Sequence, residues 1–273
     1  MHLAEYHRPV DVMTVRRLLA RTPAVALLAG GTTLVPELMA GAADTVVDLC
    51  DLPLVFADIH PDGLHLGALL TLASLTPASA AASWANGLLA RAAQAAGPIN
   101  RRNVATVGGL VARADSTSIF WLALLALEAQ AIVVAADGPP RQVALRTLAD
   151  MPAGASALQG HLLLEVLLPQ RLAQARYGLA TVARTPRDEA IVAAVAVVTP
   201  ARTTVTVVLG GVTGQPLVLS GLQEFTPDPT RLPEALADLL ARQELVSDFR
   251  GSADYRRQMA GILARRALSQ ALV

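Results

Sequence analysis

Apolar positions in the first half of the chain follow two different patterns. Over residues 11–20 an apolar residue recurs every three to four positions, and the segment 84–96 repeats this spacing, so both predict amphipathic helices. Asp11 stands where a helix N-cap is expected. The runs 25–28 and 45–49 are short and mostly apolar, which is typical of strands. This alternation predicts an α+β architecture.

Further strands are predicted in the middle of the chain. Residues 64–68 follow an Asp-Gly pair, and the segments 131–135 and 141–143 flank another, which indicates a hairpin. Residues 162–168 form an apolar run that ends at a proline. The apolar helix predicted over 119–127 follows a segment rich in serine and threonine, residues that are suited to begin a helix.

The composition changes near residue 170, where we place a domain boundary. Beyond it, turn residues separate three apolar, partly β-branched runs that predict strands, at 177–183, 190–198 and 203–209. Two helices are predicted at the end of the chain, over 232–243 and 252–272. We therefore expect a first domain over 1–170 and a smaller C-terminal α+β domain over 171–273, built on a three-stranded antiparallel sheet.

Two pairs of adjacent glycines, Gly30-Gly31 and Gly108-Gly109, each follow a short apolar run. Glycine tolerates a left-handed backbone and lets a ligand approach the main chain, and consecutive amides can bind phosphate oxygens. Neighbouring hydroxyl donors are Thr32, Thr33 and Thr106. One such pair alone usually marks a chain reversal. Two pairs of similar make-up predict a two-sided pyrophosphate clamp.

Composition and charge narrow the class of protein. Apolar residues make up 53% of the 273 residues and charged residues 16%, which is enough for a packed interior and argues against disorder. The net charge is zero, so the chain lacks the excess of basic residues that is typical of nucleic-acid-binding proteins. We found no pattern of a signal peptide or membrane span and expect a cytoplasmic protein, with neither nucleic acid nor membrane as a partner.

Candidate metal ligands and nucleotide motifs are few. Cys50 is the only cysteine, which excludes an internal disulfide and a cysteine-held iron–sulfur cluster, and we expect it to be a small buried side chain. The five histidines lack the close spacing of metal ligands, so no metal is expected in this chain. Neither Gly-x-Gly-x-x-Gly nor Gly-Lys-Ser/Thr is present, which disfavours Rossmann and P-loop sites.

The second glycine pair lies in a longer pattern that resembles a known family. Residues 102–109 (Arg-Asn-Val-Ala-Thr-Val-Gly-Gly) and 114–118 (Ala-Asp-Ser-Thr-Ser) look like the FAD-binding subunit of the xanthine dehydrogenase and aerobic carbon monoxide dehydrogenase family. The segment 29–32 is similar to the other flavin loop of that family. Weaker similarities follow in the same order along nearly the whole chain, at 48–49, 66–68, 71–72, 124–128, 162–169, 209–212 and 252–256.

The resemblance implies a fold and a cofactor. The fold is a type-2 flavin domain whose lobes, about 1–54 and 55–170, hold FAD between them, followed by the C-terminal domain. The glycine pairs would hold the pyrophosphate from opposite sides, and no side chain is required as a nucleophile or base. Asp115 is also a candidate helix N-cap. The residues implied in cofactor binding are Ala29, Gly30, Gly31, Thr32, Thr33, Leu34, Thr106, Gly108, Gly109 and Asp115.

The resemblance also implies a function. In this family a separate molybdenum subunit oxidises the substrate, and electrons cross iron–sulfur clusters to FAD and then reach an acceptor. The chain would thus be the flavoprotein electron-transfer subunit of a molybdenum hydroxylase-type oxidoreductase. Its expected partners are iron–sulfur and molybdenum-cofactor subunits.

Three positions depart from the family pattern. Leu110 replaces a usual asparagine, Ile119 replaces an aspartate, and Ala180 stands near a frequent lysine. Each change removes a polar partner from a ligand rich in hydroxyls and phosphates. The binding free energy lost is roughly 1 kcal/mol per neutral hydrogen bond. A second hypothesis therefore stays open: a divergent member with weakened or lost FAD binding, acting as a structural subunit or as a non-redox catalyst on an apolar small molecule.

Overall fold

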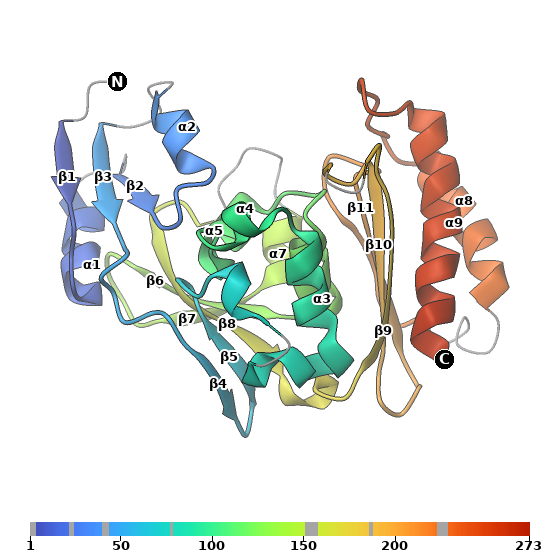
Figure 1. Ribbon diagram of the computed structural model, residues 1–273, viewed down its shortest axis with the longest axis horizontal. Coiled ribbons are helices and arrows are strands. Elements are labelled where there is room, and N and C mark those ends of the chain that lie inside the picture. Colours follow the sequence, from blue (N-terminus) through green and yellow to red (C-terminus); the bar gives the residue numbers. More distant parts are fainter. Residues whose placement is uncertain are drawn as a thin grey trace.

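The computed structural model describes residues 4–21, 25–39, 44–76, 79–150, 158–185, 188–222 and 229–273. Three β-sheets follow one another along the long axis of the molecule, in the order of the sequence (Figure 1). The N-terminal sheet lies at one end, and a central sheet carries most of the helices. The third sheet stands between these helices and the last two helices of the chain. The predicted α+β class is therefore confirmed.

The N-terminal sheet is parallel and has the strand order β1-β3-β2. Its strands are β1 (Glu5–His7), β2 (Val25–Leu28) and β3 (Thr45–Asp48). Parallel neighbours need a crossover connection rather than a tight turn. The helices α1 (Val12–Arg21) and α2 (Leu34–Met39) lie in these crossovers.

Helix α1 begins at the predicted position and joins the first sheet to the second. The carboxylate of Asp11 accepts a hydrogen bond from the amide of Thr14 at 2.8 Å, as an N-cap does. The Arg16 guanidinium donates to the carbonyl of Ala135 at 3.0 Å and to that of Gly138 at 2.7 Å. Ala135 ends one strand of a hairpin in the central sheet, and Gly138 lies in the turn of that hairpin.

The central sheet has five strands in the order β4-β5-β8-β6-β7, and every neighbouring pair is antiparallel. The strands are β4 (Ala57–His60), β5 (Gly63–Gly67), β6 (Gln130–Ala135), β7 (Arg141–Ala144) and β8 (His161–Pro169). The predicted hairpin is confirmed as β6 and β7, and the apolar run that ends at a proline is β8.

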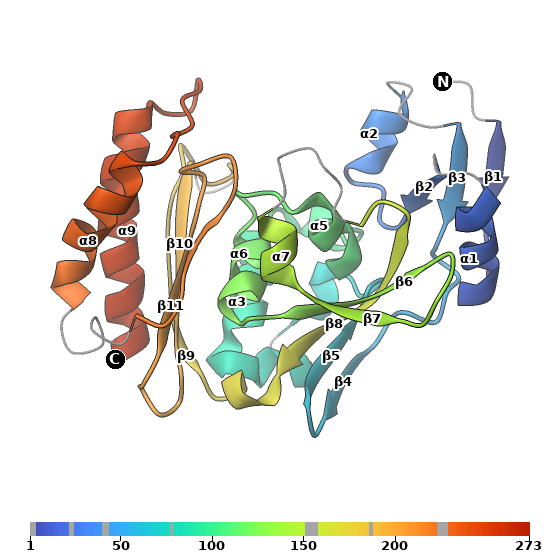
Figure 2. The same ribbon diagram turned by 180° about the vertical axis from the view of Figure 1, so that it is seen from behind.

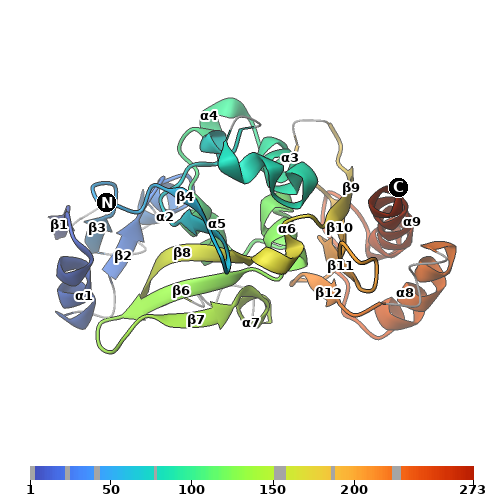
Figure 3. The ribbon, with the colours of Figure 1, turned by 90° about the horizontal axis from the view of Figure 1, so that it is seen from below.

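Helices α3, α5 and α6 lie on one side of the central sheet (Figures 2 and 3). The helices of this region are α3 (Leu88–Ala95), α4 (Ile99–Arg102), α5 (Val107–Arg113), α6 (Ile119–Ala126) and α7 (Leu145–Ala149). Short 3-10 segments occupy 72–74, 80–87, 170–172 and 229–231. The helix predicted over 84–96 begins later, at Leu88, because Ala85 and Asn86 adopt positive φ angles of 49° and 54°.

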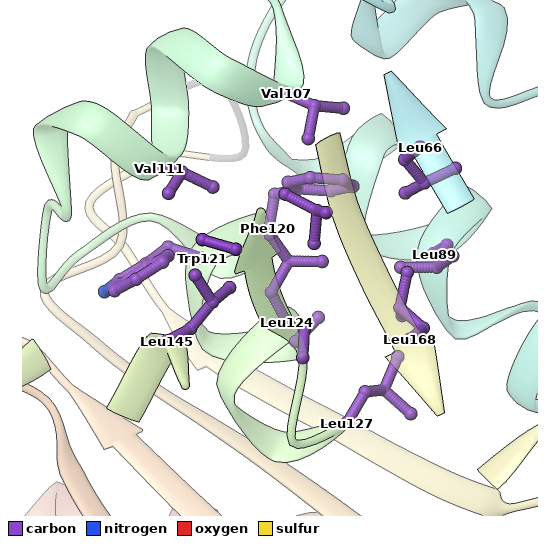
Figure 4. Close-up of a cluster of buried hydrophobic side chains, with 14 of the residues drawn as sticks. Leu66, Leu89, Val107, Val111, Phe120, Trp121, Leu124, Leu127, Leu145 and Leu168 are labelled. Carbon is purple, nitrogen blue, oxygen red and sulfur yellow. The ribbon is translucent and has the colours of Figure 1, made fainter. Parts of the chain in front are cut away.

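Helix α6 is the centre of the main core. All eight of its residues are buried, because α3 and strands β10 and β11 pack against it. Figure 4 shows Phe120, Trp121 and Leu124 of this helix among apolar side chains from α3, α5 and strands of the central sheet. A helix that is apolar on every side is expected where no side meets water.

The C-terminal sheet has four antiparallel strands, so the prediction of three is wrong. Strands β9 (Arg176–Val182), β10 (Val192–Val198) and β11 (Val205–Gly210) match the predicted runs. The additional strand at the edge is β12 (Leu217–Leu219). Three residues are too few to show a period of two, so the sequence pattern does not reveal this strand.

Strand β10 is buried on both faces. Ala193, Val195 and Val197 belong to the main core on the side of α6, and the residues between them belong to a second core. On that second side, α9 (Ala253–Leu272) covers the sheet and α8 (Leu232–Ala241) packs beside it (Figure 1). A strand covered on both faces is expected to be apolar throughout, as β10 is.

The main core extends from the N-terminal sheet through the central helices to the inner face of the C-terminal sheet. It thus includes residues on both sides of residue 170, and the domain boundary there stays a prediction. Within the described ranges, no helix combines the length and apolar character that a bilayer span needs.

Arg256 of α9 is a buried cation, with 2% of its surface exposed. Its guanidinium donates to the carbonyl of Ile191 at 2.6 Å, to that of Gly211, and to the carboxylate of Asp248 at 2.6 Å. Burial raises the pKa of Asp248, but hydrogen bonds from Arg256 and from two backbone amides outweigh it and lower that pKa. Arg256 therefore joins α9, the start of β10 and the loop before α9.

Replacing Arg256 by alanine is expected to lower the free energy of unfolding by about 3 kcal/mol, because two buried carbonyls lose their donor. Urea unfolding followed by circular dichroism measures this change. The matched control is Arg257→Ala, which removes an exposed arginine that pairs with Asp254 at 2.8 Å. Such an exposed pair contributes well under about 1 kcal/mol. Equal losses in the two variants would contradict the role of Arg256.

His65 of β5 lies between two carboxylates. Its Nδ1 atom is 3.0 Å from Oε1 of Glu165, and its Nε2 atom is 3.1 Å from Oδ1 of Asp62. Burial lowers the pKa of His65, but the hydrogen bonds to these carboxylates outweigh it and raise the pKa above its ordinary value of 6.5. The folded protein therefore binds this proton more tightly than the unfolded chain.

The contribution of His65 to stability is expected to depend on pH. Since the pKa is raised on folding, the contribution is full below about pH 6.5 and is lost as the pH rises through the folded pKa. Thermal unfolding of the natural protein and of His65→Gln should therefore differ most at low pH. A difference between the two midpoints that is constant with pH would contradict the protonated His65.

Candidate functional site

The first glycine turn, residues 29–33, connects strand β2 to helix α2. Gly31 has a φ of +68°, a left-handed conformation that favours glycine. Within the described part of the chain, no backbone amide from Gly30 to Leu34 donates a hydrogen bond. These amides, together with the exposed side chain of Thr32, are available to a ligand.

The second glycine pair forms the first turn of helix α5 rather than a chain reversal. Thr106 is the N-cap of this helix, and its hydroxyl accepts a hydrogen bond from the amide of Gly109 at 3.1 Å. The amide of Gly108 donates to the carbonyl of Ala68 at 2.8 Å. The protein therefore already binds the amides of both glycines, and the role of this pair toward a cofactor stays a prediction.

The first glycine turn lies against the chain that leads into the second glycine pair. A Cβ atom on Gly30 would be 1.7 Å from the carbonyl oxygen of Val104, just before the second segment. The helices that follow the two segments are also joined, since Glu37 of α2 and Arg113 of α5 form an ion pair at 2.9 Å. The structure thus brings two distant parts of the sequence to one place, between the N-terminal sheet and the central helices (Figure 1).

Asp115 lies in the loop between α5 and α6. Its carboxylate accepts hydrogen bonds from the amide and the hydroxyl of Thr117, both at 2.8 Å, and within the described residues it has no bond to either glycine segment. The N-cap of α6 is Ser118, so Asp115, which was one candidate for this position, does not cap the helix. The loop itself is fixed to the C-terminal sheet, because a Cβ atom on Gly210 would be 2.1 Å from the carbonyl oxygen of Ser116.

The three departures from the family pattern belong to the packed interior. Ile119 is 7% exposed and lies in the main core, and Ala180 is 4% exposed and lies in the second core. Leu110 is half-buried and packs against the main core. These side chains stabilise the protein through burial and have no polar atom to offer a ligand.

Cys50 is exposed, so the expectation of a buried side chain is wrong. It follows strand β3, where the carboxylate of Asp48 accepts a hydrogen bond from its amide at 3.0 Å. A hydrogen bond with the carboxylate of Asp48 raises the pKa of the Cys50 thiol, which therefore stays protonated near neutral pH. Among the described residues, no group of three or more His, Cys, Asp or Glu could hold a metal ion.

The sequence reasoning missed the ion pairs of this region. Besides Glu37 and Arg113, Arg101 of α4 pairs with Glu189, just before β10, at 3.5 Å. The partners of each pair lie far apart in the sequence, so no local spacing could have predicted them. The sequence indicated only that arginine would supply the cation of such a pair, because the chain contains no lysine.

Two family models match the chain. The model described as the FAD binding domain in molybdopterin dehydrogenase matches residues 2–171. The model described as the CO dehydrogenase flavoprotein C-terminal domain matches residues 179–271. Among curated proteins, no sequence matches the chain.

Solved structures share the fold over nearly the full length. A chain of the Cu,Mo-CO dehydrogenase in its cyanide-inactivated form is 27% identical, with a TM-score of 0.83 and coverage of 100% of this chain and 99% of that one. A chain of the reconstituted CO dehydrogenase from Oligotropha carboxidovorans is 26% identical, with a TM-score of 0.82 and coverages of 98% and 97%. A chain of quinoline 2-oxidoreductase from Pseudomonas putida 86, 22% identical, has a TM-score of 0.84 and coverages of 98% and 96%.

The contact at Gly30 is expected to be intolerant of any side chain. Gly30→Ala places a carbon 1.7 Å from a backbone oxygen, so the turn must move, and we expect a loss of about 3 kcal/mol in the free energy of unfolding. The matched control is Gly214→Ala, where a Cβ atom meets nothing within 4 Å and the change should stay within about 0.5 kcal/mol. Chemical unfolding measures both. A stable Gly30→Ala variant would show that the two segments do not touch.

Proposed function

Because this chain belongs to the family of FAD-binding subunits of molybdopterin dehydrogenases, we propose that it binds FAD and transfers electrons as the flavoprotein subunit of an oxidoreductase. Its structural relatives are chains of CO dehydrogenase and quinoline 2-oxidoreductase, and this chain matches each of them almost from end to end. The observation that carries the proposal is the first glycine turn. It lies against Val104, just before the second glycine pair, and its amides have no acceptor among the residues that the structure describes.

The first glycine turn fits a diphosphate. Consecutive amides beside a left-handed glycine form a concavity suited to an anion, and those from Gly30 to Leu34 have no acceptor within the described residues. Thr32 and Thr33 add two hydroxyl donors. The absence of a side chain at Gly30 lets the two segments come together around this concavity.

The second segment contributes differently. Its glycine amides are bound within the protein, so we propose that it presents the backbone of Gly108 and Gly109 to the cofactor. Thr106, 6% exposed, would hold this turn in place through the hydrogen bond that it accepts from Gly109. Asp115 has its carboxylate bound to Thr117, which fixes the loop that would border the cofactor. These residues, with Ala29 to Leu34, form the proposed cofactor-binding set.

FAD, when bound, supplies the redox chemistry. The residues of this chain would bind its diphosphate and orient it, and none of them is proposed as a nucleophile, acid or base. With a single cysteine, the chain cannot hold an iron–sulfur cluster by cysteine, so iron–sulfur and molybdenum centres would belong to partner subunits. We further propose that residues 1–170 form the FAD-binding domain and 171–273 the C-terminal domain.

A second function is favoured by one observation. Leu110, Ile119 and Ala180 pack into the interior instead of offering polar groups to a flavin. A chain that has lost several such partners could retain the fold while binding FAD weakly or not at all. It would then serve as a structural subunit, or would act on an apolar small molecule in a non-redox reaction.

The purified protein is expected to be yellow and to contain one FAD per chain.

Leu34 is the first residue of helix α2, a position that tolerates proline, and its amide has no acceptor within the described residues. Leu34→Pro therefore removes one donor to the diphosphate and should weaken FAD binding at least about tenfold relative to Leu34→Ala. The alanine variant is the matched control because it removes the same side chain and keeps the amide. Titration of the flavin-free protein, followed by flavin fluorescence, measures both affinities.

The possible results separate the two functions. A colourless protein that does not bind added FAD would contradict the flavoprotein assignment. A larger thermal shift with an apolar small molecule than with FAD would support the second function. Equal FAD affinities of the two Leu34 variants would show that the first glycine turn does not bind the diphosphate, even in a protein that binds FAD.

A further inference from the structure

The outer face of α9 lies apart from the proposed cofactor site. The inner face of this helix is buried against the C-terminal sheet by a row of alanines and leucines. Helix α8 packs beside α9, on the side of the sheet that faces away from α6 and from both glycine segments (Figures 1 and 3).

Two adjoining hollows form a groove along this face. The first lies between the two helices and is lined by Ala237 and Leu240 of α8 and by Gly261 and Ile262 of α9. The second continues along α9 past Arg266 to Val273. Ile262 and Arg265 border both hollows, which therefore form one continuous groove, named the α9 groove here.

The α9 groove is positively charged. It is lined by Arg257, Arg265 and Arg266, and none of the described residues that line it has an acidic side chain. Arg265 and Arg266 are exposed, and neither forms an ion pair within the described part of the chain. Arg257 pairs at 2.8 Å with Asp254, whose side chain is 91% exposed. A pair this exposed is weak, so Arg257 can exchange its partner for another carboxylate.

The floor of the groove is apolar. Ala237, Leu240 and Ile262 lie there, and Gly261 adds no side chain of its own. Glycine inside a helix costs about 1 kcal/mol relative to alanine, and here it leaves space between the two helices. An apolar floor with a cationic rim is complementary to a helix that carries carboxylates beside an apolar stripe.

We propose that the α9 groove binds an acidic amphipathic helix of a partner protein. Arg257 and Arg265 lie about 12 Å apart along α9, so carboxylates two turns apart on the bound helix would meet both. Guanidinium groups bind carboxylates through two parallel hydrogen bonds, which fixes the register as well as the charge. From Arg257 to Val273 the groove is about 24 Å long, the length of a helix of about 16 residues.

The test uses the full-length protein and a fluorescein-labelled peptide of about 16 residues, with leucines on one helical face and glutamates beside them. Fluorescence anisotropy should show saturable binding, weakened at least about tenfold by Arg265→Glu and also by Arg266→Glu. The matched control is Arg91→Glu, which reverses an exposed arginine on α3, outside the groove, and should leave the affinity unchanged. Thermal unfolding and FAD affinity, measured in the same variants, should not change, which separates this proposal from the proposed function.

Four results would overturn the proposal. The first is the absence of saturable binding, and the second is an equal loss of affinity in Arg91→Glu, which would indicate unspecific attraction. The third is equal binding of a peptide of the same composition whose leucines and glutamates are scrambled between faces. The fourth is equal binding of a single-stranded oligonucleotide of the same charge, which would show that the groove recognises charge alone.

Discussion

The arrangement of this molecule depends on backbone approaching backbone without an intervening side chain. At Gly30 the turn after β2 lies against the carbonyl of Val104, and at Gly210 the end of β11 lies against the carbonyl of Ser116. The first contact joins the N-terminal sheet to the central helices, and the second joins those helices to the C-terminal sheet. Because no residue with a Cβ atom fits at these distances, both contacts require glycine whatever the chemistry of the site.

The sequence was informative where one period or one composition extends over many residues. Helix α6, which is apolar on every side, and strand β10, which is buried on both faces, were predicted. Burial on every side requires a continuous apolar run in the sequence. The edge strand β12 was missed because three residues carry no period. Cys50 was expected to be buried and is exposed, because strand β3 ends at Asp48 and Cys50 lies in the turn that follows the strand.

The candidate site was predictable in its residues but not in its geometry. The two glycine pairs look alike in the sequence, but their structures differ. The first is a left-handed turn whose amides have no acceptor among the described residues, and the second is the capped start of a helix. The difference arises from the segment 68–72, whose carbonyls accept the amides of Val107 and Gly108. A pairing between segments this far apart leaves no local signal, and neither does the ion pair of Glu37 with Arg113.

Strand β10 links the two cores of the protein, since alternate side chains of one short segment belong to each. Neither core can be dismantled without exposing a face of this strand to water, and the loss of one face removes the support for the other. Both cores should therefore unfold together in one cooperative transition. The signal from any reporter, wherever it is attached in the two cores, should then follow the same transition.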